Sequence, residues 1–188
     1  MMNSIGQAEL LILEGDLKKA DELLLSIITE EPDNLEAILF QGIVYTETGR
    51  EDQAIKALEY YNMKNDANSE AWEALGCAWF RKGFPEKGKE CLLTAYSLRG
   101  NSPSILRNLG IIEEKAGNSA KALSLLKRSY LIDAKDYRTV YALAFGYLNR
   151  GEKLRAQEHF ERLLTMTLPD DVKEESTIML LRLKLDWL

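Results

Sequence analysis

Five glycines in this sequence follow one another at a fixed spacing of 34 residues. They stand at Gly15, Gly49, Gly83, Gly117 and Gly151. The chain has only 12 glycines among its 188 residues. Chance would place five of them on one given register on the order of one time in a million, and a fixed period of this length is typical of tandem structural repeats.

Three further columns of similar residues share this register. The first holds small residues at Ala8, Gly42, Gly76, Gly110 and Ala144. The second is also small, with Ala20, Ala54, Gly88, Ala122 and Ala156, and the third is large and apolar, with Leu24, Leu58, Leu92, Leu126 and Phe160. Between the columns, apolar residues recur every three or four positions, which indicates helices. Each repeat is therefore predicted to contain two antiparallel helices that cross closely where both carry small residues.

The column that begins with Gly15 lies between the two predicted helices of each repeat. The chain must leave helical geometry there, and glycine readily adopts the left-handed conformation that ends a helix. The residues that follow suit the start of a second helix, because Asp16 and Asn118 are suitable N-caps and Pro85 fits a first turn. Local chemistry therefore agrees with the period.

The repeat resembles the tetratricopeptide repeat, a helical hairpin of 34 residues. Its third copy carries the pattern most fully, with Trp72, Leu75, Gly76, Trp79 and Gly83. The resemblance covers residues 1–170, although Glu113 stands where the family has an aromatic residue and Gly88 where it has alanine. It implies an all-α fold, a right-handed α-solenoid or superhelix of antiparallel helix pairs.

One domain is expected to include residues 1–188. Its repeats are predicted at 1–34, 35–68, 69–102, 103–136 and 137–170, followed by a C-terminal capping helix at 171–188. A solenoid needs such a cap because its last repeat otherwise exposes an apolar face.

The capping segment is unusually apolar. Ile178, Leu181, Leu185 and Leu188 form one helical stripe, while Met179, Leu180, Leu183 and Trp187 lie off it. One interpretation is a cap whose wide apolar face is buried on the last repeat. The other is that the surplus face, within 178–188, supports self-association or pairing with a partner.

The resemblance implies that function lies on a concave groove lined by the first helix of each repeat. The candidate peptide-binding residues in this groove are Leu39, Ile43, Glu73, Cys77, Phe80, Arg107, Ile111, Arg138, Tyr141, Phe145 and Leu148. The alternative is that Leu39, Ile43, Ile111 and Phe145 are covered within the fold.

The predicted groove is also divided by charge. Acidic residues belong to the early repeats, at Glu9, Glu36, Glu47, Glu70 and Glu73, and basic residues to the later ones, at Arg81, Arg107, Lys115 and Arg138. We therefore expect an extended or helical peptide with apolar anchors, whose acidic end lies near Arg107 and Arg138.

Composition argues against two other classes of partner. The formal net charge is −6, with 30 acidic and 24 basic residues, whereas nucleic acid binding depends on an excess of Lys and Arg. No stretch approaches the roughly 20 apolar residues of a membrane span, and the N-terminus lacks the basic start of a secretory signal. We expect a cytoplasmic protein with a protein or peptide as partner, and neither nucleic acid binding nor membrane insertion.

Catalytic and metal-binding patterns are missing from the sequence. His159 is the single histidine, and Cys77 and Cys91 are 14 residues apart, which fits neither a CxxC pair nor zinc-ligand spacing. Glycine motifs that bind phosphate do not occur. His159 is interpreted as a surface residue and Cys77 as a packed neutral thiol. No enzymatic activity, metal or cofactor is expected.

Two functions remain open. The first is an adaptor or scaffold that binds a peptide or helix of a partner protein. The second is a small secretion-type or assembly-type chaperone that shields an apolar client segment. Binding of chaperone tails is disfavoured, because the family grips their carboxylates with Lys and Asn, whereas the matching positions here pair Leu39 with Ile43, Glu73 with Cys77 and Arg107 with Ile111.

Overall fold

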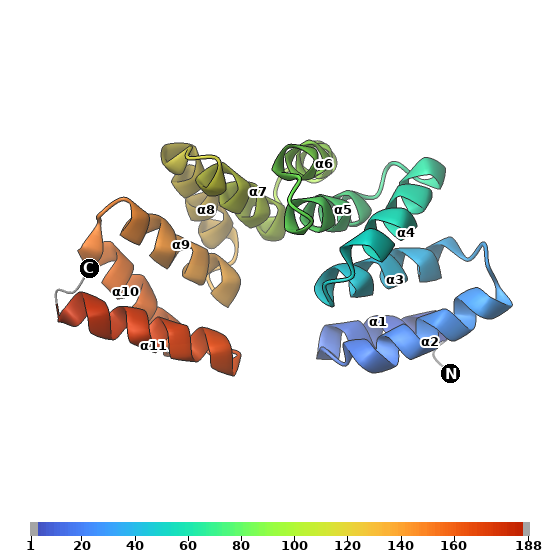
Figure 1. Cartoon of the computed structure of the whole chain (residues 1–188), viewed down its shortest axis with the longest axis horizontal. Coiled ribbons are helices and arrows are strands. Elements are labelled where there is room, and N and C mark those ends of the chain that lie inside the picture. Colours follow the sequence, from blue (N-terminus) through green and yellow to red (C-terminus); the bar gives the residue numbers. More distant parts are fainter. Residues whose placement is uncertain (1–3, 186–188) are drawn as a thin grey trace. The chain divides into compact units, whose positions relative to one another are not determined.

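The structure is a computed structural model that describes residues 4–185, which contain helices and no strand. In chain order these are α1 (Ser4–Glu14), α2 (Leu17–Glu30), α3 (Leu35–Glu47), α4 (Glu51–Lys64), α5 (Ser69–Arg81), α6 (Pro85–Leu98), α7 (Pro103–Lys115), α8 (Ser119–Ile132), α9 (Tyr137–Asn149), α10 (Lys153–Leu163) and α11 (Asp170–Lys184) (Figure 1). The predicted fold class, an all-α helical-repeat solenoid, is confirmed.

The helices belong to two compact units. The first unit ends at Arg99 and contains α1 to α6, and the second begins at Gly100 and contains α7 to α11. Within each unit, consecutive helices are in contact, and first helices of neighbouring pairs also meet, as α3 does with α5 and α7 with α9. A single domain over the whole chain stays a prediction.

Glycines fix both the turns and the helix crossings. Each glycine of the column that begins with Gly15 has a positive φ, from 72° at Gly151 to 91° at Gly83, which confirms its predicted left-handed conformation. Gly76 and Gly88 serve the crossing of α5 and α6. A Cβ atom on Gly88 would lie 2.7 Å from the carbonyl oxygen of Gly76, so the two backbones nearly touch.

The helix starts follow the predicted chemistry at two of three positions. Asp16 caps α2 by accepting a hydrogen bond of 3.3 Å from the backbone N–H of Lys19, and Pro85 occupies the first turn of α6. The prediction for Asn118 was wrong. Its side chain makes no capping bond to α8, and its Nδ2 donates a hydrogen bond to the carboxylate of Glu113 at 2.7 Å.

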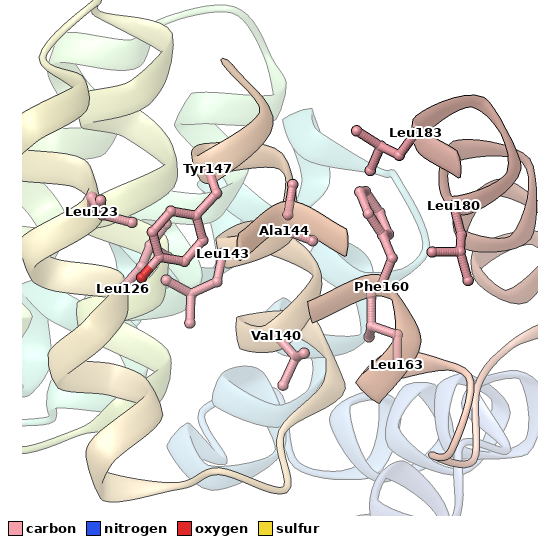
Figure 2. Packing of buried hydrophobic residues seen from close by; sticks show 11 residues of the cluster. Leu123, Leu126, Val140, Leu143, Ala144, Tyr147, Phe160, Leu163, Leu180 and Leu183 are labelled. Atoms are coloured by element: carbon pink, nitrogen blue, oxygen red, sulfur yellow. The ribbon is translucent and has the colours of Figure 1, made fainter. Parts of the chain in front are cut away.

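Each unit has its own apolar core. In the first unit, Ala20 and Leu24 belong to one cluster, and Leu58 and Leu75 to another. In the second unit, Phe160 and Leu163 of α10 meet Leu143 of α9 and the leucines of α11 in one cluster (Figure 2). The large apolar column of the repeat therefore supplies the centre of each core.

The capping helix α11 is buried on the side opposite to its predicted stripe. Leu180 and Leu183 pack against the cluster around Phe160, and Figure 2 shows them on the side of α11 nearest that ring. Ile178, Leu181 and Leu185 are 40%, 54% and 54% exposed. We call these three residues the outer stripe. Leu188 and Trp187 lie outside the described residues.

Candidate functional site

The predicted groove residues lie on the first helices of the pairs, in both units. Leu39 and Ile43 belong to α3, Glu73, Cys77 and Phe80 to α5, Arg107 and Ile111 to α7, and Arg138, Tyr141, Phe145 and Leu148 to α9. That they line one groove divided by charge stays a prediction. The two units are described in turn.

In the first unit, the candidate residues differ in how far they reach solvent. Leu39 is only 5% exposed and belongs to the core cluster of α3, α4 and α5. Ile43, Glu73, Cys77 and Phe80 are half-buried. The guanidinium of Arg81 donates a hydrogen bond to the backbone oxygen of Thr46, which ties α5 to α3. Leu39 therefore offers little surface to a ligand, whereas its neighbours remain partly accessible.

Acidic groups influence one another in this unit. The pKa of Glu70 is raised by loss of water around its carboxyl group and by the Glu9 carboxylate, while Arg99 lowers it. Glu70 as a residue remains exposed. Glu9 and Glu70, two of the acidic residues predicted for the groove, are therefore close enough for the charge of one carboxylate to affect the pKa of the other.

In the second unit, four of the apolar candidate residues are half-buried. They are Ile111, Tyr141, Phe145 and Leu148, and we call them the aromatic face. The rings of Tyr141 and Phe145 have centroids 4.8 Å apart, and Phe145 meets the buried ring of Phe160 edge-on at 5.3 Å. Such ring pairs are held in a defined geometry, so the aromatic face is anchored on the core of its unit.

Tyr141 also joins the aromatic face to the capping helix. Its hydroxyl donates a hydrogen bond to the carboxylate of Glu175 on α11. Burial raises the pKa of Tyr141, and the hydrogen bond to Glu175 and the charge of that carboxylate raise it further. The phenol therefore stays protonated at neutral pH and acts as a donor.

Arg107 is engaged inside the second unit. It is 9% exposed, and its guanidinium forms an ion pair with Asp136, the residue that caps α9. Burial raises the pKa of Asp136, but the Arg107 charge and hydrogen bonds from Thr139, Arg107 and the Arg138 backbone outweigh it and lower the pKa. A ligand carboxylate would have to compete with Asp136 for Arg107. Arg138 is the more exposed of the two cations, with its guanidinium 5.9 Å from the ring of Tyr137.

A cleft of about 500 Å³ in the first unit lies away from the predicted groove residues. We call it the outer cleft; Glu59 and Asn62 of α4, Trp72 and Trp79 of α5, and Glu90 and Cys91 of α6 are among its lining residues. This cleft was not predicted from the sequence, because both tryptophans fit the repeat pattern. One signal was present: Asn62 is the polar member of a column that otherwise reads Ile28, Tyr96, Tyr130 and Leu164.

The thiol in this cleft is not activated. Burial raises the pKa of Cys91 to about 11, and the carboxylates of Glu90 and Glu59 contribute to the rise. The thiol is therefore protonated at neutral pH and is a weak nucleophile. Within residues 4–185, no three His, Cys, Asp or Glu side chains gather as a metal ion would require. None of the helices there combines the length and apolar character needed to cross a membrane.

Comparison with known sequences points to one family. A family model described as "Tetratricopeptide repeat" matches residues 11–76. Human tetratricopeptide repeat protein 7A is 29% identical over 91 residues, which are 48% of this chain and 11% of that protein. The chain thus spans far less than two thirds of that relative.

Solved structures share the fold along nearly the whole chain. A thermophilic TPR protein of Thermus thermophilus is 19% identical, with a TM-score of 0.83 over 95% of this chain and 98% of that one. A tetratricopeptide repeat protein from Parabacteroides merdae is 16% identical, with a TM-score of 0.74 over 98% of this chain and 71% of that one. At these identities the likeness shows the fold alone.

Proposed function

The chain is a tetratricopeptide repeat protein, and from this premise we propose that it binds a segment of a partner protein on the aromatic face of its second unit. The tetratricopeptide fold is a protein–protein interaction module, in which stacked helix pairs build an extended binding surface. Such proteins are generally scaffolds, and we assign no reaction and no cofactor. The proposed setting is the cytoplasm, where its two thiols stay reduced.

The observation that carries this proposal is the half-buried state of the aromatic face. Tyr141 and Phe145 are already ordered by their ring contact and by the edge-on contact of Phe145 with Phe160. Ordered aromatic side chains lose little conformational freedom on binding, and tyrosine is frequent among residues that dominate binding energy. The partner segment is therefore an extended or helical peptide that places apolar side chains on this face.

Charge sets the proposed direction of the peptide. Arg138 lies on the same helix as the aromatic rings and is exposed, so an acidic residue of the peptide lies near it. Arg107 contributes less, because Asp136 already neutralises its charge. For the first unit taken by itself, Ile43, Cys77 and Phe80 are half-buried candidates for apolar contacts with a peptide bound there, and Glu73 would favour a basic residue in that peptide.

The proposal is tested by peptide selection on the intact chain. A random peptide library displayed on phage is selected against the immobilised protein, and affinities of the selected peptides are measured by fluorescence polarisation. Leu148→Glu places a charge on the aromatic face and is expected to weaken these peptides at least tenfold. Leu131→Glu on α8 is the matched control, since Leu131 is 83% exposed and lies outside this face.

Two results would contradict the proposal. One is a selection that returns no peptide with saturable affinity. The other is a set of peptides that bind Leu148→Glu and Leu131→Glu equally well, while circular dichroism shows both variants folded as the parent chain.

The outer stripe of α11 supports a second candidate function. Ile178, Leu181 and Leu185 are exposed apolar residues spaced for one side of α11, which suits either self-association or shielding of an apolar client segment by a small chaperone. Leu181→Glu should reduce the molar mass seen by light scattering if copies associate through the stripe. It should reduce protection of the reduced insulin B chain from aggregation if the stripe holds clients.

The matched control is Leu154→Glu on α10, because Leu154 is 78% exposed and lies outside the stripe. A parent chain that is monomeric at all concentrations and gives the insulin chain no protection would remove both roles of the stripe and leave an adaptor.

A further inference from the structure

The outer cleft lies on a different side of α5 from the predicted groove residues of that helix. At 100° per residue, Trp72, Leu75 and Trp79 occupy one side of α5, whereas Glu73, Cys77 and Phe80 occupy another. The remaining walls come from α4 and α6, the second helices of their pairs. The cleft is therefore a separate surface, and its volume of about 500 Å³ is within the range of small-ligand sites.

An unsatisfied amide lines this cleft. Asn62 is 7% exposed, and neither its Nδ2 nor its Oδ1 has a hydrogen-bond partner among the described residues. Buried polar groups in folded proteins are almost always paired, so an unpaired amide calls for an explanation such as a bound group. The next residue, Met63, is 81% exposed and also lines the cleft.

The cleft already accommodates a cation of its own chain. The ammonium of Lys87 lies 4.1 Å from the ring centroid of Trp79, a cation–π contact. No cation from the described part of the chain lies over the ring of Trp72. The Nε1 of Trp72 donates to the backbone oxygen of Asp66 at 2.8 Å, which fixes the plane of that indole. A second aromatic surface for a cation is therefore held in place.

The charges around the cleft favour a positive ligand. Two carboxylates, Glu59 and Glu90, line it beside the single ammonium of Lys87. The effect of both carboxylates on the Cys91 pKa exceeds that of Lys87, after the dominant effect of burial. With two carboxylates and one ammonium among its lining residues, the cleft carries a net negative charge, and the protonated thiol contributes an apolar wall.

We propose that the outer cleft binds an arginine side chain presented by a partner protein. The guanidinium stacks on Trp72 and donates hydrogen bonds to the carboxylates of Glu59 and Glu90 and to Oδ1 of Asn62. Nδ2 of Asn62 donates to a backbone carbonyl of the partner. Arginine fits better than lysine, because its planar group stacks on aromatic faces and its five donors pair with several acceptors at once. This inference is independent of the proposed function of the aromatic face.

The test uses the full chain with nitrogen-15 in its tryptophans. The indole N–H signals of Trp72 and Trp79 are followed by NMR during titration with N-acetyl-arginine amide. N-acetyl-citrulline amide has nearly the same shape without the charge, and N-acetyl-leucine amide tests an apolar occupant. We expect saturable shifts with the arginine compound and binding at least tenfold weaker with the other two.

Variants assign the binding to the cleft. Glu59→Gln combined with Glu90→Gln should weaken the arginine compound about tenfold, whereas Glu86→Gln, an acid of α6 outside the cleft, should leave affinity unchanged. Asn62→Leu should raise the denaturation midpoint, because it removes an unpaired amide, and should still weaken binding. A purely structural asparagine would not give these opposite effects.

The proposal is overturned if the arginine compound produces no saturable shift of either indole. It is equally overturned if citrulline or leucine amide binds as tightly, which would make the site neutral or apolar. Because the aromatic face belongs to the other unit, Leu148→Glu should not affect this titration, so failure of one proposal does not decide the other.

Discussion

Glu113 is a buried carboxylate at a position where the family carries an aromatic side chain. It is 1% exposed, and its oxygens accept hydrogen bonds of 2.7 Å from Asn118 and from the ammonium of Lys121. Taking a carboxylate out of water costs free energy that a single ion pair seldom returns in full. The hydrogen bonds from Asn118 and Lys121 offset part of this cost in the second unit.

Removing the ammonium of Lys121 should lower the free energy of unfolding more than removing the buried carboxylate of Glu113. Lys121→Met leaves Glu113 buried with less compensation, so we expect a loss of about 1–3 kcal/mol in the free energy of unfolding. Glu113→Tyr restores the family residue and frees Asn118 to cap α8, so it should be neutral or stabilising. Urea denaturation followed by circular dichroism measures both. Lys56→Met is the control, because Lys56 is an exposed lysine of α4, and equal effects of the two lysine variants would refute this account.

Asp136 should make the stability of the fold depend on acid pH. Its pKa is lowered in the folded chain, because Arg107 and three hydrogen bonds outweigh the effect of burial. The ionised form therefore stabilises the fold above the unfolded-state pKa of about 4, and this contribution is lost as the pH falls through the lower folded value. Asp136→Asn should cost about 1–3 kcal/mol at neutral pH, because Arg107 loses its charged partner.

The measurement compares thermal unfolding of the parent and the variant from neutral pH down to about pH 2, well below the usual carboxyl pKa. The two stabilities should converge on acidification, since both chains then lack an ionised group at this position. Asp66→Asn serves as control, as Asp66 is exposed and its side chain has no described partner. A difference that stays constant with pH would show that Asp136 stabilises the fold without its charge.

The close crossing of α5 and α6 is the feature of the helix pairs most sensitive to a single methyl group. The other four pairs have alanine in the second small column, but this pair has Gly88 opposite Gly76. A Cβ on Gly88 would lie 2.7 Å from the Gly76 oxygen and 3.1 Å from the Phe80 backbone nitrogen, and backbone atoms cannot move aside cheaply. α5 and α6 therefore pack at a distance that requires glycine at position 88.

Gly88→Ala should therefore destabilise the chain although alanine is the better helix former. Propensity favours alanine by about 1 kcal/mol, whereas overpacking of this kind costs roughly 1–3 kcal/mol, so we expect a net loss of about 1 kcal/mol. The midpoint of urea denaturation measures it. Ser124→Ala on the exposed side of α8 should be neutral or slightly stabilising. If Gly88→Ala matched or exceeded the parent stability, the helices would have relaxed to the spacing of the other pairs.

The positions of the helices could be predicted from the sequence because each depends on local, repeated chemistry. A glycine of positive φ ends each first helix, and small residues mark each crossing. The exposure of single residues could not be predicted, because it depends on which side chains neighbouring helices place over them. Leu39 is covered, whereas Ile43, one turn later on α3, is half-buried. The outer cleft and the unpaired Asn62 depend on three helices at once, so the period alone did not reveal them.

At the scale of the molecule, the two compact units could unfold separately or together. Each unit has its own buried leucines, among them Leu58 in the first and Leu143 in the second. In repeat proteins stability is close to a sum of local terms and nearest-neighbour terms, so a weakened repeat need not unfold the distant ones. Trp72 and Trp79 both lie on α5 and report on the first unit alone once Trp187→Phe removes the third indole.

In that background, Leu143→Ala should cost about 2–5 kcal/mol in the second unit. The denaturation midpoint seen by circular dichroism should fall, while the midpoint seen by tryptophan fluorescence should move far less. Leu58→Ala, an equally buried leucine of the first unit, should lower the fluorescence midpoint strongly. If each variant shifted both midpoints by the same amount, the chain would unfold as one cooperative block. The single domain predicted from the sequence would then describe the unfolding of the chain better than two units do. The reason would be that the coupling free energy between neighbouring repeats exceeds the free energy lost by Leu143→Ala or Leu58→Ala in either core.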